Sequence, residues 1–197
     1  AGPTDMSVGD SAGAGWGSSA ASTADVNGFI KKVVFGFENR IIHPTAVVLH
    51  FTGDADASVE ATVRDLKGNT SGGCSPYCTV QLTTDAQGKT YQLVNPLNVQ
   101  TQHACVINDK AIGLEIGGSG EAQLLANDTQ FKGVVSAVIA LVKKFDIPLV
   151  DDPANKRGII SHQEADKEAY GCHSGKVDPG ETYKRKVIDE VKKEMGK

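Results

Sequence analysis

The 197-residue chain is long enough to bury one hydrophobic core, and 40% hydrophobic and 22% charged residues are typical of a globular domain. A formal net charge of −4 is too mild to indicate a nucleic-acid-binding protein. No apolar run approaches the roughly 18 residues that span a bilayer. These features favour a single globular domain that neither binds nucleic acid nor crosses a membrane.

The N-terminal residues 1–24 are rich in Gly, Ala and Ser, which is typical of a flexible leader. We therefore expect the folded domain to comprise residues 25–197. Its first segment, Val26–Phe37, is ambiguous between a short helix and an extended entry into the fold.

Short apolar and β-branched runs predict buried strands at Thr45–Phe51, Ala111–Ile116 and Arg157–Ser161. Between the first two, alternating segments at Thr79–Thr83 and Thr90–Val94 flank the turn-forming stretch "DAQG". This arrangement predicts a β-hairpin.

Three segments have a helical period. Ser58 stands as an N-cap before "VEATVRDL", and Phe131–Phe145 places its apolar side chains on one stripe. The C-terminal "KRKVIDEVKKEMGK" is basic, but its acidic residues are interleaved and its valines and isoleucine recur at helical spacing, which favours a solvated helix over a binding patch. Strands and helices together predict an α/β fold with a single mixed central β-sheet flanked by helices.

His50 and His162 lie at the ends of two separate predicted strands. One such histidine is most often structural, but two can converge on a Zn²⁺ ion if their strands are neighbours. A catalytic zinc site needs a third protein ligand. The residues alone leave it open among Glu164, Asp166, Cys172, His173 and Asp178. The Pro-Gly turn that follows Asp178 favours that residue, and we expect Glu164, Asp166 and Glu168 to be solvated.

Glu115 and Lys176 are candidates for the chemistry at such a site. Ile112, Leu114 and Ile116 alternate around Glu115, so its side chain should face the other side of the strand. There it would suit a general base beside a cavity, or it would be an ordinary solvated glutamate. Lys176, two residues before Asp178, would either stabilise an oxyanion or be an ordinary loop lysine.

Four cysteines allow three disulfide pairings. Cys74 and Cys78 bracket a tight turn, and a bridge between them would leave Cys105 to pair with Cys172. The alternative is four reduced thiols in a cytosolic protein.

Four segments occur in the order "VVLHFTG", "GKTYQLV", "QHACVINDKAIGLEIGG" and "IISHQEA…GKVDPGETY". Together they resemble the zinc-dependent N-acetylmuramoyl-L-alanine amidases of the amidase-2 type, which are similar in fold to peptidoglycan recognition proteins and phage T7-like lysozyme. The resemblance covers residues 40–185. It implies one Zn²⁺ ion held by three protein ligands, an acidic catalytic residue, and a lysine that stabilises the transition state. The implied residues are His50, His162 and Asp178 for the metal, Glu115 and Lys176 for catalysis, and His103 and Asn108 for the substrate groove.

The chain departs from the family pattern at three places. Gln102 replaces the usual aromatic residue before His103, and Thr79 or Val80 stands where recognition proteins have a catalytic tyrosine, which assigns proton transfer to Glu115. The loop from His162 to Asp178 is longer than usual and contains Cys172, the rival third ligand. The "CSPYC" pair is similar to a short-spaced disulfide of the recognition proteins.

The resemblance predicts a monomeric peptidoglycan hydrolase that cuts the amide bond between N-acetylmuramic acid and L-alanine in peptidoglycan or muropeptides. Such an enzyme would be secreted, periplasmic, bound at the cell envelope or delivered by a phage. A non-catalytic peptidoglycan-binding or sensing module on the same fold is the alternative. A structural zinc protein is disfavoured, because a four-ligand structural site usually needs a second closely spaced cysteine pair besides "CSPYC", and the sequence has none.

Overall fold

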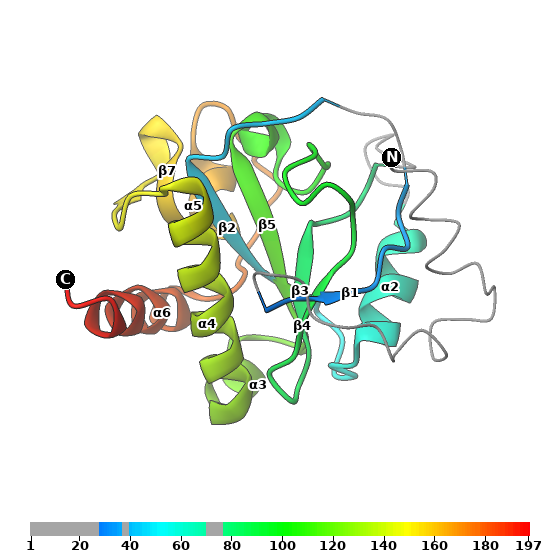
Figure 1. Ribbon diagram of the computed structural model, residues 1–197. Coiled ribbons are helices and arrows are strands. Elements are labelled where there is room, and N and C mark those ends of the chain that lie inside the picture. Colours follow the sequence, from blue (N-terminus) through cyan, green and yellow to red (C-terminus); the bar gives the residue numbers. More distant parts are fainter. Residues whose placement is uncertain (1–27, 37–39, 70–76) are drawn as a thin grey trace.

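The structure, a computed structural model, describes residues 28–36, 40–69 and 77–197 (Figure 1). The predicted leader at residues 1–24 and the predicted disulfide partner Cys74 lie outside these ranges.

Seven strands form one mixed sheet in the order β1-β4-β3-β5-β2-β7-β6. Strands β3, β5, β2 and β7 are parallel neighbours, while β4 is antiparallel to β3 and β6 is antiparallel to β7. The predicted single mixed sheet is therefore confirmed. The strand bounds are β1 Ile30–Lys31, β2 Ala46–Phe51, β3 Leu82–Thr84, β4 Thr90–Gln92, β5 Ala111–Ile116, β6 Asp151–Asp152 and β7 Arg157–Ser161.

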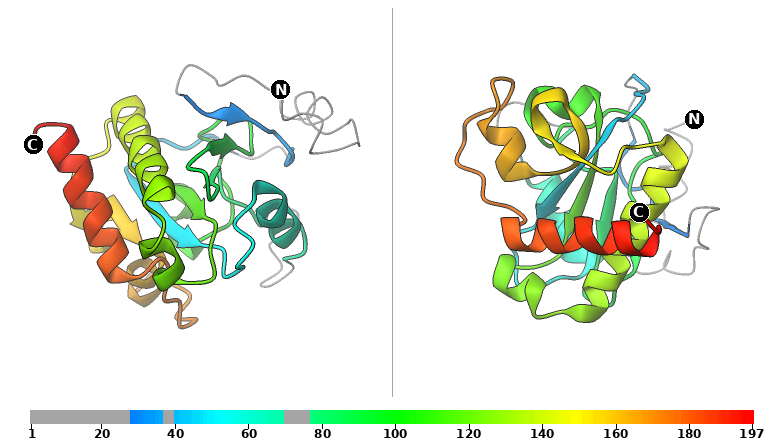
Figure 2. Two further views of the ribbon diagram at one scale, coloured as in Figure 1. Left: turned by 90° about the horizontal axis from the view of Figure 1, so that it is seen from below. Right: turned by 90° about the vertical axis from the view of Figure 1, so that its left-hand side faces the viewer.

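Helices cover both faces of this sheet. The helices α4 (Asp128–Phe145) and α6 (Glu181–Glu194) lie side by side over one face, next to the short α3 (Glu121–Leu125) (Figure 2). The other face carries α5 (His162–Lys167) and the 3-10 helix η4 (Cys105–Asp109), and α2 (Val59–Lys67) packs near β3. A second 3-10 helix, η5 (Pro153–Asn155), leads into β7.

The alternation of β5 sorts its side chains between these two layers. Ile112, Leu114 and Ile116 are fully buried in the main core, against α4 and α6. Ala111 packs on the opposite face with Ile107 and Ile160. Glu115 must share the face of Ala111, because successive strand side chains point to opposite sides.

The three predicted helices are present. Ser58 caps α2 by accepting a hydrogen bond from the Ala61 N–H, and the apolar side of α6 is buried. Helix α4 begins at Asp128, before the predicted Phe131, because the Asn127 side chain caps the Gln130 N–H. The described part of Val26–Phe37 is extended and contributes β1.

One expectation about local structure is wrong. The segment after β7 does not begin as a loop, because His162–Lys167 forms helix α5. Ser161 and Glu164 form a capping box, in which each side chain accepts a hydrogen bond from the other residue's backbone N–H. Such a box stabilises even a short helix.

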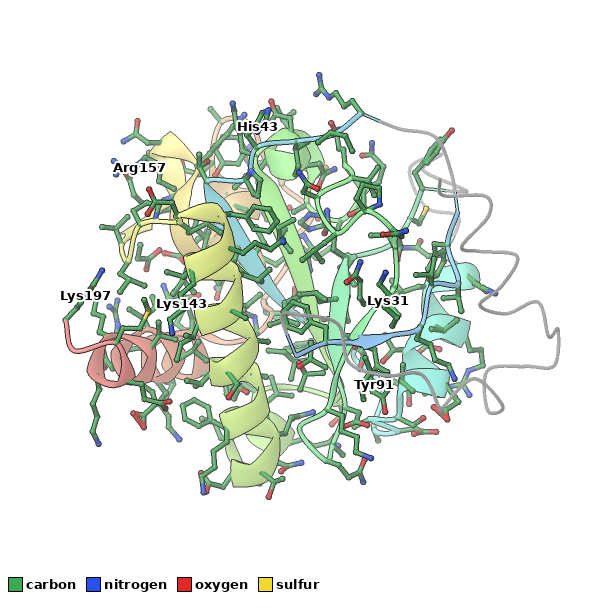
Figure 3. The ribbon with its side chains drawn as sticks, viewed as in Figure 1. Lys31, His43, Tyr91, Lys143, Arg157 and Lys197 are labelled. Atoms are coloured by element: carbon green, nitrogen blue, oxygen red, sulfur yellow. A yellow bond between two sulfur atoms is a disulfide. The ribbon has the colours of Figure 1, made fainter. Side chains whose placement is uncertain are left out.

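Basic side chains are spread over the surface. Lys143, Arg157 and Lys197 are exposed on the side of α4 and α6, and Lys31 lies apart from them (Figure 3).

No helix among the described residues is long and apolar enough to cross a membrane.

A disulfide joins Cys105 at the start of η4 to Cys172 in the loop after α5, with 5.9 Å between the two Cα atoms. Cys78 is also disulfide-bonded. The Cys105–Cys172 bridge ties two segments that are separated by 67 residues in the sequence.

We expect the double variant Cys105→Ser, Cys172→Ser to lose about 2–4 kcal/mol of unfolding free energy, because the unfolded chain regains the entropy of a long open loop. Urea denaturation measures the loss as the shift in midpoint between the variant and the parent, with the same dependence of unfolding free energy on urea concentration used for both. An unchanged midpoint would mean that this bridge does not constrain the unfolded chain.

Candidate active site

The parallel register of three central strands brings the candidate residues together. His50 on β2 is directly opposite Glu115 on β5, and Leu49 is opposite Ser161 on β7. His162 follows Ser161, so it lies beside His50 at the carboxyl end of the strands, where ligands bind in open α/β sheets. The two histidines therefore come from neighbouring strands, as convergence on one ion requires.

His50, His162 and Asp178 form the group that could hold a metal ion. One ligand atom from each lies within 4.8 Å of the other two. The Asp178 Oδ2 atom is 3.3 Å from His50 Nδ1 and 3.1 Å from His162 Nδ1. His50 and Asp178 are buried, and the His162 side chain is only 11% exposed.

A chain of hydrogen bonds decides which nitrogen of His50 faces this group. His103 Nε2 is 3.4 Å from the Ala111 carbonyl oxygen, and His103 Nδ1 is 3.0 Å from His50 Nε2. A carbonyl oxygen only accepts, so His103 carries its proton on Nε2 and accepts from His50 Nε2–H. The opposite arrangement would set an unprotonated nitrogen against the carbonyl oxygen. His50 Nδ1 is therefore left with a free lone pair beside Asp178.

The charges of the group suit a cation. Burial and the neighbouring His162 lower the pKa of His50 to about 4, so its imidazole is neutral near pH 7. Burial alone would raise the pKa of Asp178, but the hydrogen bond with His162 leads the contacts that outweigh burial, and the pKa falls below its usual range. A cation between Asp178 Oδ2 and His50 Nδ1 would be attracted both by the carboxylate and by the nitrogen lone pair. Two imidazoles and one carboxylate match the donor set of a zinc site with an open fourth position.

Gly113 makes room for His103. A Cβ atom at Gly113 would lie 2.8 Å from His103 Nδ1 and 2.9 Å from Val80 Cγ1, which is closer than real Cβ contacts. On the other side, the Asn108 Oδ1 atom accepts from the backbone N–H groups of His103 and Ala104. Asn108 is 2% exposed, and its Nδ2 group donates to the Gln102 side chain. The glycine and the amide together fix the position of the His103 ring.

Glu115 lies next to the metal-ligand group and is 9% exposed, so the alternative of a solvated glutamate is wrong. Burial, followed by the charge of Asp178, raises the pKa of Glu115 well above its usual range, while the Lys176 charge opposes the shift. The side chain of Lys176 is exposed, and its charge also acts on His50. Both residues are therefore near the group: Glu115 is buried beside it, and Lys176 is exposed to solvent.

These residues line a cleft of about 800 Å³. Helix α2 contributes Thr62, Asp65 and Leu66 to its wall, and the disulfide-bonded Cys105 and Cys172 line it as well. His103 and Asn108, which we expected in the groove, are also among the lining residues.

The other four candidates for the third ligand are engaged elsewhere or face outward. Cys172 is in a disulfide, and His173 is exposed in the loop. Glu164 closes the capping box and pairs with Lys184 at 2.9 Å. The expectation that Asp166 is solvated is wrong, since it is 4% exposed and accepts hydrogen bonds from the loop. The "SHQE" capping signature was the sequence signal that would have revealed the helix under these residues.

Replacing Gly113 by Ala should weaken Zn²⁺ affinity roughly 10–100-fold, because the added Cβ displaces His103 and breaks its bond to His50. Competition with a chromogenic chelator measures the affinity. Gly120→Ala is the matched control, since a Cβ there meets nothing within 4 Å. A folded Gly113→Ala protein with the control's affinity would contradict this role of His103.

Comparison with known proteins identifies the family. The family model described as N-acetylmuramoyl-L-alanine amidase matches residues 40–181. No curated protein matches the sequence closely enough to count as a relative.

Solved structures share the fold at low sequence identity. The Staphylococcus aureus hydrolase AmiA, in complex with its ligand, has a TM-score of 0.64 and 13% identity, with 84% of each chain covered. The Ph2119 endolysin, from a Thermus scotoductus bacteriophage, has a TM-score of 0.55 and 19% identity over 79% of this chain and 89% of its own. The endolysin LysCS from Clostridium intestinale has a TM-score of 0.54 and 14% identity over 88% and 99%. Since the family model spans most of the described chain, this protein belongs to the N-acetylmuramoyl-L-alanine amidase family.

Proposed function

We propose that the chain is a zinc-dependent peptidoglycan amidase that hydrolyses the bond between the lactyl group of N-acetylmuramic acid and L-alanine of the stem peptide. His50, His162 and Asp178 would hold the ion. The observation that supports the proposal is the register of β2 and β5, because it sets Glu115 directly beside His50, a proposed metal ligand, in a cleft.

A bound Zn²⁺ ion would supply a Lewis-acid centre that lowers the pKa of a coordinated water and polarises the scissile carbonyl. Glu115 takes a proton from the attacking water as the new C–O bond forms, and it passes that proton to the amine as the C–N bond breaks. Burial, followed by the charge of Asp178, raises the pKa of Glu115, which makes it a stronger proton acceptor than a solvated carboxylate. Lys176 donates a hydrogen bond to the oxyanion of the tetrahedral intermediate.

His103 and Asn108 act on the metal site from behind. The bond from His50 Nε2–H to His103 keeps His50 Nδ1 free for the ion, and Asn108 holds the His103 backbone. Partners of this kind orient metal ligands and raise their basicity. We assign both residues a positioning role and leave substrate contact to the open walls of the cleft.

The substrate of such an enzyme lies in the cell envelope. The Cys105–Cys172 disulfide is consistent with work outside the cytoplasm, where such bridges persist. We propose that the protein acts there as a secreted, periplasmic, envelope-bound or phage-delivered monomer.

Glu115→Gln should retain one Zn²⁺ ion per chain and lower kcat roughly 10²–10⁴-fold, because an amide cannot accept the proton of water. The assay is release of peptides with a new N-terminal L-alanine from purified peptidoglycan. Glu194→Gln, on the exposed end of α6, is the matched control and should keep full activity. A fully active Glu115→Gln enzyme would exclude Glu115 as the base.

Removal of the metal separates the amidase from a non-catalytic binding module. Dialysis against a chelator should abolish peptide release, and one equivalent of Zn²⁺ should restore it and raise the Tm, since the ion binds only the folded chain. A protein that binds peptidoglycan but releases no L-alanyl peptide with or without Zn²⁺ would be the binding module.

A further inference from the structure

Asp166 is a buried carboxylate that the proposed mechanism does not use. Its Oδ1 atom accepts from the Ser174 N–H and from the Ser174 hydroxyl, both at 2.9 Å. Its Oδ2 atom accepts from the N–H groups of Gly175 at 2.9 Å and Lys176 at 3.2 Å. Four hydrogen bonds from three consecutive residues converge on one side chain.

The loop that these bonds hold is exposed and unusually shaped. All residues from Cys172 to Val177 are exposed, and His173 and Gly175 have positive φ angles of 52° and 76°. The His173 N–H donates to the Asp166 backbone oxygen at 3.1 Å, which adds a fifth bond to the same residue. A loop with this exposure has few apolar contacts to define its course, so beyond the disulfide at Cys172 the bonds to Asp166 hold its backbone.

Helix α5 carries both Asp166 and His162, one of the proposed metal ligands. His162 and Asp166 are four residues apart and therefore lie on the same face of the helix. The Gln163 N–H, in the first turn, donates to the Asp178 carbonyl oxygen at 3.1 Å. The same helix thus presents a metal ligand, fixes the backbone of a second ligand, and holds the backbone at Lys176 between them.

We propose that Asp166 is a positioning residue that fixes the Ser174–Lys176 backbone and so places the Lys176 ammonium at the rim of the metal site. This inference rests on the proposed function, because it acts through the role of Lys176 in that mechanism. The loop is anchored from below, by α5, and its outer side is left open to substrate.

The charge of Asp166 is stable over the working range of an envelope enzyme. Burial alone would raise the pKa of Asp166, but the hydrogen bonds from Ser174, Lys176 and Gly175 outweigh it and lower the pKa to about 2. A carboxylate with a lowered pKa keeps its contribution to stability above its unfolded pKa and loses it only as the pH falls toward 2. The anchor therefore remains ionised from mildly acidic to alkaline pH.

The test uses Asp166→Asn in the full chain. The amide keeps one acceptor oxygen and turns an NH₂ group toward backbone N–H groups, which removes about half of the anchor. Amide hydrogen exchange should speed up at least about tenfold at Ser174, Gly175 and Lys176, and stay unchanged in β5. Glu168→Gln is the matched control, because its side chain makes none of the bonds to residues 174–176. Unchanged exchange in Asp166→Asn would overturn the anchor, whatever the enzyme's activity.

A double-mutant cycle tests whether Asp166 acts through Lys176. We expect Asp166→Asn to lower kcat roughly 10–100-fold with one Zn²⁺ ion per chain retained, since small misplacements of a catalytic group cost that much. In a Lys176→Ala background, the same change should cost less than about threefold. Fully multiplicative losses, or loss of Zn²⁺ with Asp166→Asn, would show a merely structural role and overturn the inference.

An inactive parent protein and a variant that does not fold have separate consequences. An inactive parent protein would refute the proposed function, while the exchange measurement would still decide the anchor. If Asp166→Asn does not fold, Ser174→Ala removes a single hydroxyl bond to Asp166 and should give a smaller loss of kcat in the same direction. No loss of kcat in that variant would count against the proposal.

Discussion

The parallel register of β5, β2 and β7 is the constraint on which the site depends. Residues that pair across parallel strands point to the same face, so pairing of His50 with Glu115 commits both side chains to the cleft. The β2–β7 register then brings His162 beside them. A shift of one residue in either pair would turn a histidine or the carboxylate of this group into the core that Leu49 and Leu114 occupy. The packing of that apolar face against α4 and α6 therefore also fixes the geometry of the polar face.

Short segments at the edge of the sheet complete what the strands begin. Helix α5 starts with a capping box, and the buried Lys184 of α6 pairs with Glu164 of that box. On the other side, Asn108 of η4 holds the backbone at His103. The Cys105–Cys172 disulfide joins the η4 segment to the loop that leads to Asp178. The segments around the candidate metal-binding group are thus held by a capping box, by the Asn108 side chain and by a covalent bridge, which favours precise placement of such a group.

Much of the fold was predictable, because each strong periodicity coincided with an observed element. The run at Ala111–Ile116 became β5 with the same bounds, and the stripe from Phe131 became the body of α4. The segment after β7 was misjudged because its helix is short and polar, and helices of that kind are defined by their caps and tertiary contacts. The burial of Asp166 was missed for a related reason. Three of the four bonds to its carboxylate come from backbone N–H groups eight to ten residues away, and these leave no pattern in side-chain chemistry.

The sequence by itself determined the mixed α/β architecture, the family, and the pair of histidines at strand ends, because hydrophobic periodicity and residue order along the chain carry that information. Only the tertiary structure decided among the residues that follow His162. It brings Asp178 to the histidines, encloses Cys172 in a disulfide and turns Asp166 inward. It also gave His103, which lines the cleft, a hydrogen-bond partner on His50. These choices depend on distances between segments that are far apart in the chain, and such distances are fixed only when the sheet and its loops pack together.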